Sequence, residues 1–137
     1  MERIFVDTDI VLDLLGQREP FYEYSAGIFS LADQGKIKLC VSSLSFSNLH
    51  YILTRQLSAD QSRKKLLKLK TLVSVLPVTE KVIELALSSD FKDFEDGVQY
   101  FTAIEQNIKL LLTRNLKDYK AAEIPVLTAE QYLKLRK

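Results

Sequence analysis

Residues 3–9 read Arg3-Ile4-Phe5-Val6-Asp7-Thr8-Asp9, and this stretch places acidic side chains directly after a short strand. Its first four residues are rich in strand formers, and the apolar run ends abruptly at Asp7. Apolar residues then recur at helical spacing as far as Leu15, and Gly16 offers a helix stop. Asp7 is therefore expected at the carboxyl end of a strand, at the point where a helix begins.

Strands and helices alternate along the rest of the chain. Further strands are expected at residues 37–41, 72–76, 109–113 and 124–127. Helices are expected at about residues 20–35, 43–57, 58–70, 80–88 and 94–107, and a last helix is capped by Thr128 and Gln131. Strands that are apolar at consecutive positions indicate a parallel sheet that is covered on both faces. We therefore expect a single α/β domain over residues 1–137, a three-layer α/β/α sandwich with a mainly parallel five-stranded sheet.

Composition excludes several classes of protein. The chain has 19 Lys+Arg against 18 Asp+Glu, so its net charge of +1 is not the bulk positive charge of a sequence-independent nucleic-acid binder. Cys40 and His50 are the only residues of their types, which excludes an intrachain disulfide, a thiolate cluster and a two-histidine metal site. The N-terminus lacks the pattern of a signal peptide, and no apolar run is long enough to span a bilayer. We therefore expect a cytoplasmic protein without a membrane association.

Polar residues gather where α/β proteins form their sites, beyond the carboxyl ends of the strands. The first expected strand is followed by Asp7, Thr8 and Asp9, and Asn48 lies about a turn into the helix after the second. The fourth strand is followed by Thr113, Arg114, Asn115 and Asp118, and the helix before it begins with Asp93, Glu95 and Asp96. Carboxylate oxygens without His or Cys select Mg²⁺ or Mn²⁺, ions that bind phosphates and activate water. The cluster thus predicts phosphodiester hydrolysis.

A simpler interpretation exists for single members of this cluster. Asp9 and Glu95, taken singly, are better explained as helix caps or solvated loop residues, and capping alone is a rival explanation for Asp7. Capping explains a whole set of acids and amides at one sheet edge less well. The cluster therefore remains the better hypothesis for the set.

Basic residues outside the cluster also allow two interpretations. Those between Arg55 and Lys70 are better explained as a solvated helix face than as an RNA-binding surface. Arg114, Lys117 and Lys120 lie beside the acidic cluster and are better placed to hold substrate phosphates, although Lys117 could also be an ordinary surface residue.

Three segments resemble the PIN-domain family, and the resemblance covers nearly the whole chain. Phe5-Val6-Asp7-Thr8-Asp9-Ile10 resembles the opening strand and first catalytic aspartate of the family. Asp93-Phe94-Glu95-Asp96-Gly97-Val98-Gln99 resembles its helix-heading acidic motif, with Asp96 as the second metal-binding aspartate. Leu112-Thr113-Arg114-Asn115-Leu116-Lys117-Asp118-Tyr119 is similar to the segment after the fourth strand, in which Thr-Arg-Asp/Asn precedes Asp-Phe. The order and spacing of the three motifs carry the resemblance.

The resemblance implies an endoribonuclease that depends on Mg²⁺ or Mn²⁺. It implies that Asp7 and Asp96 hold one or two metal ions, that water attacks an RNA phosphodiester in line, and that Thr113 or Thr8 orients a ligand or phosphate. The other expected members of the site are Asp93, Asp118, Asp9, Asn48, Glu95 and Asn115. It also implies the toxin of a toxin–antitoxin pair, with an antitoxin protein as partner and a homodimer as assembly.

Two positions depart from the family pattern. Asn48 stands where the family usually has an acidic residue, commonly Glu, and Asn115 stands where many members have Asp. An amide can coordinate a metal through its carbonyl oxygen but contributes no charge. The site is therefore expected to bind metal more weakly, or to lean on Asp93, Glu95 or Asp118. The alternative function is a catalytically weak or inactive PIN-like module that binds RNA or a protein partner.

Overall fold

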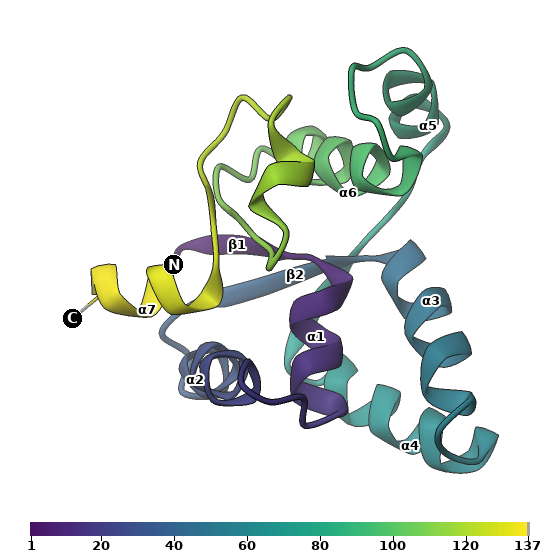
Figure 1. The fold of residues 1–137 in the computed structure, drawn as a ribbon, viewed down its shortest axis with the longest axis vertical. Coiled ribbons are helices and arrows are strands. Elements are labelled where there is room, and N and C mark those ends of the chain that lie inside the picture. Colours follow the sequence, from purple (N-terminus) through teal and green to yellow (C-terminus); the bar gives the residue numbers. More distant parts are fainter. Residues whose placement is uncertain (137) are drawn as a thin grey trace.

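Within residues 1–136, which the structure describes, five parallel strands form one central sheet (Figure 1). The structure is a computed structural model. The strands are β1 (Arg3–Val6), β2 (Lys38–Ser42), β3 (Val73–Leu76), β4 (Leu111–Leu112) and β5 (Val126–Leu127). They lie in the order β3-β2-β1-β4-β5, and every neighbouring pair is parallel. The expected α/β class is confirmed, and the sheet is parallel throughout the part of the chain described.

Helices cover both faces of this sheet (Figure 1). One face carries α1 (Thr8–Leu15), α2 (Tyr22–Asp33), α3 (Ser43–Thr54), α4 (Ala59–Lys70) and α7 (Ala129–Arg136). The opposite face carries α5 (Glu80–Leu87), α6 (Phe94–Glu105) and the short 3₁₀ helix η1 (Leu116–Tyr119). This arrangement confirms the three-layer α/β/α sandwich. Among the described residues, no helix combines the length and the apolar character that crossing a membrane requires.

Residues of β1 alternate between two apolar clusters, one on each face of the sheet. Ile4 and Val6 pack into the cluster that includes α1, α2 and α3, whereas Phe5 packs on the opposite face with residues of α6 such as Tyr100. All three strand residues are 0% exposed, and burying each contributes about 1.5–3 kcal/mol. Cys40 is buried in the same cluster as Phe5. This packing holds β1, and the residues that follow it, at the centre of the molecule.

Side chains cap the helices much as the sequence predicts. Thr128 and Gln131 form the expected reciprocal cap at α7, in which each side chain accepts from the backbone N–H of the other residue, at 2.9 and 3.1 Å. Ser58 forms a similar capping box with Gln61 at α4. Thr79 caps α5 without such a box. Caps of this kind each contribute about 1 kcal/mol and set where the helices begin.

The last third of the chain differs most from the expectation. β4 is shorter than the expected strand 109–113, although backbone hydrogen bonds continue on both sides of it, from Phe5 N to Leu110 O (3.0 Å) and from Thr113 N to Leu127 O (3.0 Å). η1 was not expected, because a single four-residue turn has no helical repeat of apolar residues. It brings Asp118 and Tyr119 to the carboxyl end of β1, where the candidate site lies.

Candidate metal site

The sheet order makes β1 and β4 the place where a site is expected to form. Along the chain β1 is followed by β2 and β3 on one side of the sheet, whereas β4 and β5 lie on its other side. The chain therefore leaves the carboxyl ends of β1 and β4 in opposite directions. In open α/β sheets, ligands bind in the crevice that forms between two such strands. Asp7 follows β1 directly, and its N–H donates to the carbonyl of Leu112, the last residue of β4, at 2.9 Å.

Asp7 is held through both of its carboxylate oxygens. Its Oδ1 accepts from the backbone N–H of Thr8 (2.7 Å), which makes Asp7 the N-cap of α1. Its Oδ2 accepts from the hydroxyls of Thr113 (2.9 Å) and Tyr119 (3.0 Å). Burial raises the pKa of Asp7 although these hydrogen bonds lower it, and the charge of Asp118 raises it further. Asp7 therefore both caps a helix and faces other acids. Its contact with Tyr119 was missed, because the motif identifies that residue only as aromatic.

Asp9 lies beside Asp7, and only one of its two carboxylate oxygens accepts hydrogen bonds. Its Oδ2 accepts from the backbone N–H of Arg114 and the side-chain amide of Asn115, each at 3.2 Å. The hydroxyl of Thr113 also lies 3.2 Å away, but its single proton can serve Asp9 or Asp7 and not both. Oδ1 is buried without a hydrogen-bond partner among the described residues. Burial, and then the charge of Asp7, raise the pKa of Asp9 to about 7.

The start of α6 presents Asp96 to the same space. Asp93 is the N-cap of this helix, because its Oδ1 accepts from the N–H groups of Glu95 (2.8 Å) and Asp96 (3.3 Å). Burial, and then the charges of Asp7, Asp93 and Asp118, raise the pKa of Asp96 to about 7. Asp7 exerts the largest of these charge effects on Asp96. The two acidic motifs, almost ninety residues apart in sequence, therefore meet at the end of β1.

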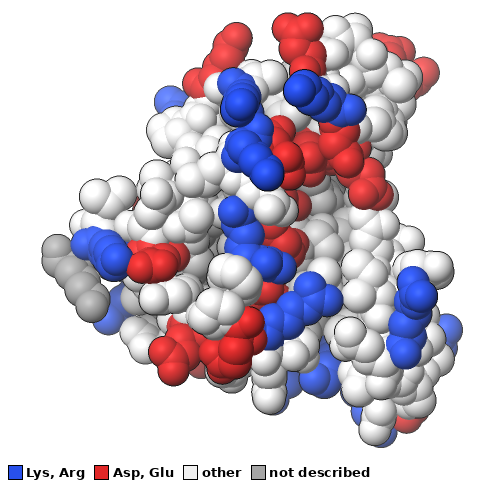
Figure 2. Space-filling view, in the orientation of Figure 1, with Lys and Arg blue, Asp and Glu red and all other residues white. Residues whose placement is uncertain are grey.

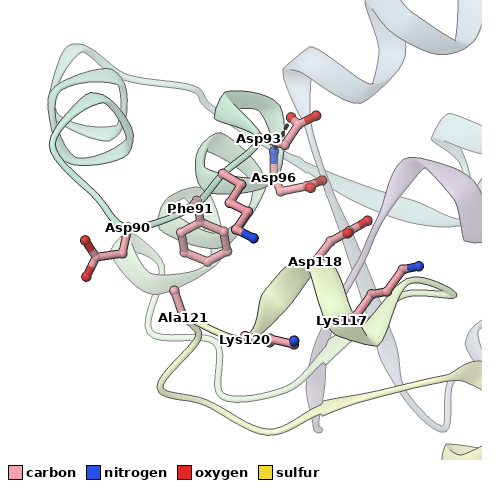
Figure 3. Close-up of a pocket in the computed structure, with 9 residues that line it drawn as sticks. Asp90, Phe91, Asp93, Asp96, Lys117, Asp118, Lys120 and Ala121 are labelled. Carbon is pink, nitrogen blue, oxygen red and sulfur yellow. Dashed lines mark hydrogen bonds between the residues drawn. The ribbon is translucent and has the colours of Figure 1, made fainter.

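Asp118 completes the acidic group from η1. Together with Asp93 and Asp96 it lines a cavity of about 240 Å³ (Figure 3). Figure 3 shows the carboxyl groups of Asp96 and Asp118 turned toward the same side of this cavity, with Lys117 beside them. On the molecular surface, acidic side chains gather in one patch with basic side chains directly next to it (Figure 2). The structure thus brings the expected acids of three segments to one place.

The two amides that depart from the family pattern each contact an acid. Asn48, half-buried in α3, donates through Nδ2 to Oε1 of Glu95 (3.3 Å), which is exposed in the first turn of α6. Asn115 donates to Asp9, as described above. Neither amide adds negative charge, but each holds a carboxylate supplied by another segment.

Thr8 belongs to a buried polar network below the acids. Its Oγ1 lies 2.9 Å from Oγ of Ser45, and Nε2 of Gln99 donates to both hydroxyls, at 3.1 and 3.0 Å. Gln99 is 3% exposed and Ser45 is fully buried. The network therefore links α1, α3 and α6, the helices next to which the candidate residues lie. Gln99 was not expected in the site, although Gln99 stands three residues after Asp96 and so lies on the same face of α6.

Arg114 is engaged by other residues of the protein. Its Nε lies 2.9 Å from Oδ2 of Asp13, which is fully buried in α1, and its guanidinium carbon lies 4.2 Å from the ring centre of Phe21. A buried carboxylate requires such a cationic partner. Asp13 was missed, and its signal is an acid inside an otherwise apolar helix. Lys117, by contrast, is exposed at the cavity.

The chemistry of the donors suits a hard divalent cation. Asp7, Asp9 and Asp96 share raised pKa values, and Oδ1 of Asp9 is buried without a donor. A divalent cation would relieve both the mutual repulsion and the missing contact. Within residues 1–136, however, no three His, Cys, Asp or Glu side chains are already arranged to hold a metal ion. Because Asp96 is half-buried and Asp118 is exposed, their side chains have room to close around one.

The chain belongs to the PIN domain family, whose model matches residues 3–117. This match covers the first two segments that resemble the family and the third as far as Lys117, and it confirms the family expected from them.

Similar proteins include a named ribonuclease and several solved structures that share the fold. The chain is 30% identical over 139 residues to "Ribonuclease VapC1" of Aquifex aeolicus, a match that covers 96% of this chain and 93% of that one. Its fold is similar to that of DNA-bound VapBC from Salmonella typhimurium, with a TM-score of 0.70, 14% identity and coverage of 94% and 99%. It is also similar to Mycobacterium tuberculosis VapC20, a sarcin–ricin loop cleaving toxin, with a TM-score of 0.64, 18% identity and coverage of 89% and 98%.

Proposed function

We propose that the protein is an endoribonuclease that depends on Mg²⁺ or Mn²⁺ and hydrolyses RNA phosphodiester bonds. The observation that carries the proposal is the meeting of Asp7, Asp9 and Asp96, whose pKa values are raised first by burial and then by the charges of neighbouring acids. Negative charge that is concentrated in this way is stabilised by a cation. The relative named as a ribonuclease supports the choice of RNA as substrate.

Asp7 and Asp96 are the residues that would hold the metal, and Asp9 and Asp118 are the acids next to them. A bound Mg²⁺ would supply Lewis-acid stabilisation of the phosphodiester as negative charge develops on it. The protein contributes a fixed orientation for Asp7, because Thr8, Thr113 and Tyr119 together occupy both of its oxygens. Asp93 contributes by holding the first turn of α6, on which Asp96 lies.

The proposal extends to the cellular role and the assembly. We propose that the protein is the toxin of a toxin–antitoxin pair, that it acts in the cytoplasm, and that it forms a homodimer. Structures of VapBC and FitAB complexes, which share its fold, support a protein antitoxin as partner. Inducible expression should then arrest growth, and co-expression of a small protein encoded beside it should restore growth. Growth that is unaffected by expression would argue against the toxin role but not against RNA cleavage.

Replacement of the two central acids tests the nuclease. We expect Asp7→Asn and Asp96→Asn each to lower Mg²⁺-dependent cleavage of RNA on the order of 10³-fold, because each removes a charge that the metal requires. Chelation of metal should abolish cleavage by the wild-type protein. Circular dichroism should show that both variants stay folded, since each keeps the shape of the side chain. A double variant that still cleaves would show that the observed cleavage comes from elsewhere.

A second function is a PIN module without catalysis that binds RNA or a protein partner. The neutral Asn48 and Asn115, and the lack of a preformed group of three metal-binding side chains among the described residues, favour it. Calorimetry separates the two functions. Binding of Mn²⁺ that is lost in Asp96→Asn supports the nuclease, and no detectable metal binding supports the second function.

A further inference from the structure

The cavity beside the candidate metal site is lined by basic as well as acidic side chains. Lys92, Lys117 and Lys120 line it together with Asp93, Asp96 and Asp118. Lys92 precedes α6, whereas Lys117 lies in η1 and Lys120 directly follows it. Figure 3 shows Lys117 and Lys120 on the side of the cavity that η1 forms, opposite Asp93 and Asp96 at the start of α6. Two segments that are distant in sequence therefore supply the three cationic side chains.

These three lysines have no ion-pair partner in the part of the chain that the structure describes. The salt bridges found there are made by Lys64, Lys81, Arg114 and Lys134. Lys92, Lys117 and Lys120 are all exposed, so their amino groups are available to a ligand. Arg114 is not available in the same way, because it lies against Asp13 and Phe21.

A divalent cation would change the charge of this cavity. The acids of the lining nearly balance the lysines, and one further acid, Asp90, points away from the cavity in Figure 3. A cation with two positive charges, held by Asp7 and Asp96, would cancel the charge of those two acids and leave three lysines against Asp93 and Asp118 in this part of the lining. The cavity then attracts a second anion next to the one that the metal holds.

We infer that Lys92, Lys117 and Lys120 bind the phosphate of a nucleotide that neighbours the cleaved bond, in a single-stranded segment of RNA. The inference rests on the proposed function, because it takes RNA as the substrate. It names the charged surface that positions the substrate, and it places that surface on η1 and the start of α6. The basic face of α4 has no part in it.

A second cavity, lined by aromatic and aliphatic side chains as well as by the acids Asp90 and Glu123, lies next to the first one and favours a single strand. This second cavity, of about 460 Å³, shares Asp90, Phe91 and Ala121 with the first and is also lined by Phe101 and Ile104. A nucleotide with its phosphate on the lysines has an aromatic and apolar surface within reach of its base. Bases in a duplex are stacked and paired, whereas bases of a single strand are free to pack on such surfaces.

Binding without cleavage tests the inference. A short fluorescein-labelled oligouridylate is titrated, in Ca²⁺ in place of Mg²⁺, with the wild-type protein and with the variant Lys92→Gln, Lys117→Gln, Lys120→Gln, so that Asp7 and Asp96 are both present to hold a cation. Fluorescence anisotropy over a series of salt concentrations gives the slope of log K against log salt. That slope should fall by about 0.7 for each lysine lost, or about 2 for the triple variant. A perfect RNA duplex should compete poorly for the protein.

The matched control removes three positive charges elsewhere. Arg63→Gln, Lys64→Gln and Lys70→Gln change exposed residues of α4 and should leave the salt slope unchanged, although the net charge falls equally. The triple variant of Lys92, Lys117 and Lys120 is called the cavity variant, and the phosphate site that these lysines form is called the subsite. An unchanged slope in the cavity variant, or an equal fall in both variants, overturns the subsite. Duplex RNA that competes as well as the single strand overturns the preference for a single strand.

Cleavage kinetics in Mg²⁺ separate the proposed phosphate-binding role of the three lysines from the proposed nuclease activity. If RNA is cleaved, the cavity variant should raise KM more than it lowers kcat, because the lysines hold substrate away from the reacting atoms. Cleavage with an unchanged KM rejects the subsite and leaves the nuclease standing. Loss of binding in the cavity variant, together with no cleavage by the wild-type protein, rejects the nuclease and leaves the subsite standing.

Discussion

Thr113 is the residue that joins β4 to both acids of the Asp7-Thr8-Asp9 segment. It is fully buried, and its Oγ1 lies 2.9 Å from Oδ2 of Asp7 and 3.2 Å from Oδ2 of Asp9. We expect Thr113→Val to lower the free energy of unfolding by about 1–3 kcal/mol, because the buried carboxylate of Asp7 loses one of its hydrogen-bond donors. It should also weaken Mn²⁺ binding, since the carboxylate of Asp7 is then less firmly oriented. Thr113→Ser keeps the hydroxyl and should restore both properties. Urea unfolding and calorimetric titration measure them, and equal Mn²⁺ affinities for the Val and Ser variants would contradict this role.

Helix α6 depends on Asp93 for its first turn, and its first turn carries Asp96. Asp93 was expected among the catalytic residues, but one of its oxygens accepts from two backbone N–H groups and acts as a cap. We expect Asp93→Ala to cost about 1 kcal/mol of stability and to lower activity, because the turn that holds Asp96 loosens. Asp93→Asn keeps a capping oxygen and removes a charge that raises the pKa of Asp96, so it should remain stable and active. Thermal unfolding and RNA cleavage test the pair. Equal inactivity of both variants would instead make the charge of Asp93 essential.

The molecule as a whole should lose stability as the pH rises when no metal is present. Asp9 and Asp96 have a pKa of about 7 in the folded protein against an ordinary value of 3.8, so the folded state binds protons that the unfolded chain has already released. Their contribution is fully present below about pH 4 and is lost as the pH rises through about 7. We therefore expect the melting temperature in chelator to fall from about pH 5 to about pH 7 and to change little above that.

Added Mg²⁺ should reverse this trend, because it competes with protons for the same carboxylates. The stabilisation by Mg²⁺ should therefore be larger at about pH 8 than at about pH 6. An Asp9→Asn, Asp96→Asn variant is the control, and its melting temperature should depend little on pH in this range. A wild-type protein whose melting temperature is unaffected by pH in chelator would remove the basis of the prediction.

The positions of the acids could be predicted from sequence because local patterns determine them. A short apolar strand ends before Asp7, and a capped helix begins around Asp96, so both lie at one edge of a parallel sheet. The partners of these acids could not be predicted in the same way. Tyr119 with Asp7 and Arg114 with Asp13 are pairs separated by about a hundred residues, and only the packing of η1 and β4 beside β1 brings them together. η1 itself is too short to leave a periodic signal.

The distance along the chain between Asp7 and its hydrogen-bond partners has a consequence during protein synthesis. Thr113 and Tyr119 are 106 and 112 residues further along the chain. At a translation rate of roughly 5–20 residues per second, Asp7 is added to the chain roughly 5–20 seconds before either partner. A nascent or prematurely terminated chain that ends before β4 therefore has Asp7 without the hydroxyls that orient it. If the protein cleaves RNA as proposed, the ribosome and the message that produce it are not exposed to a complete site until translation is nearly finished.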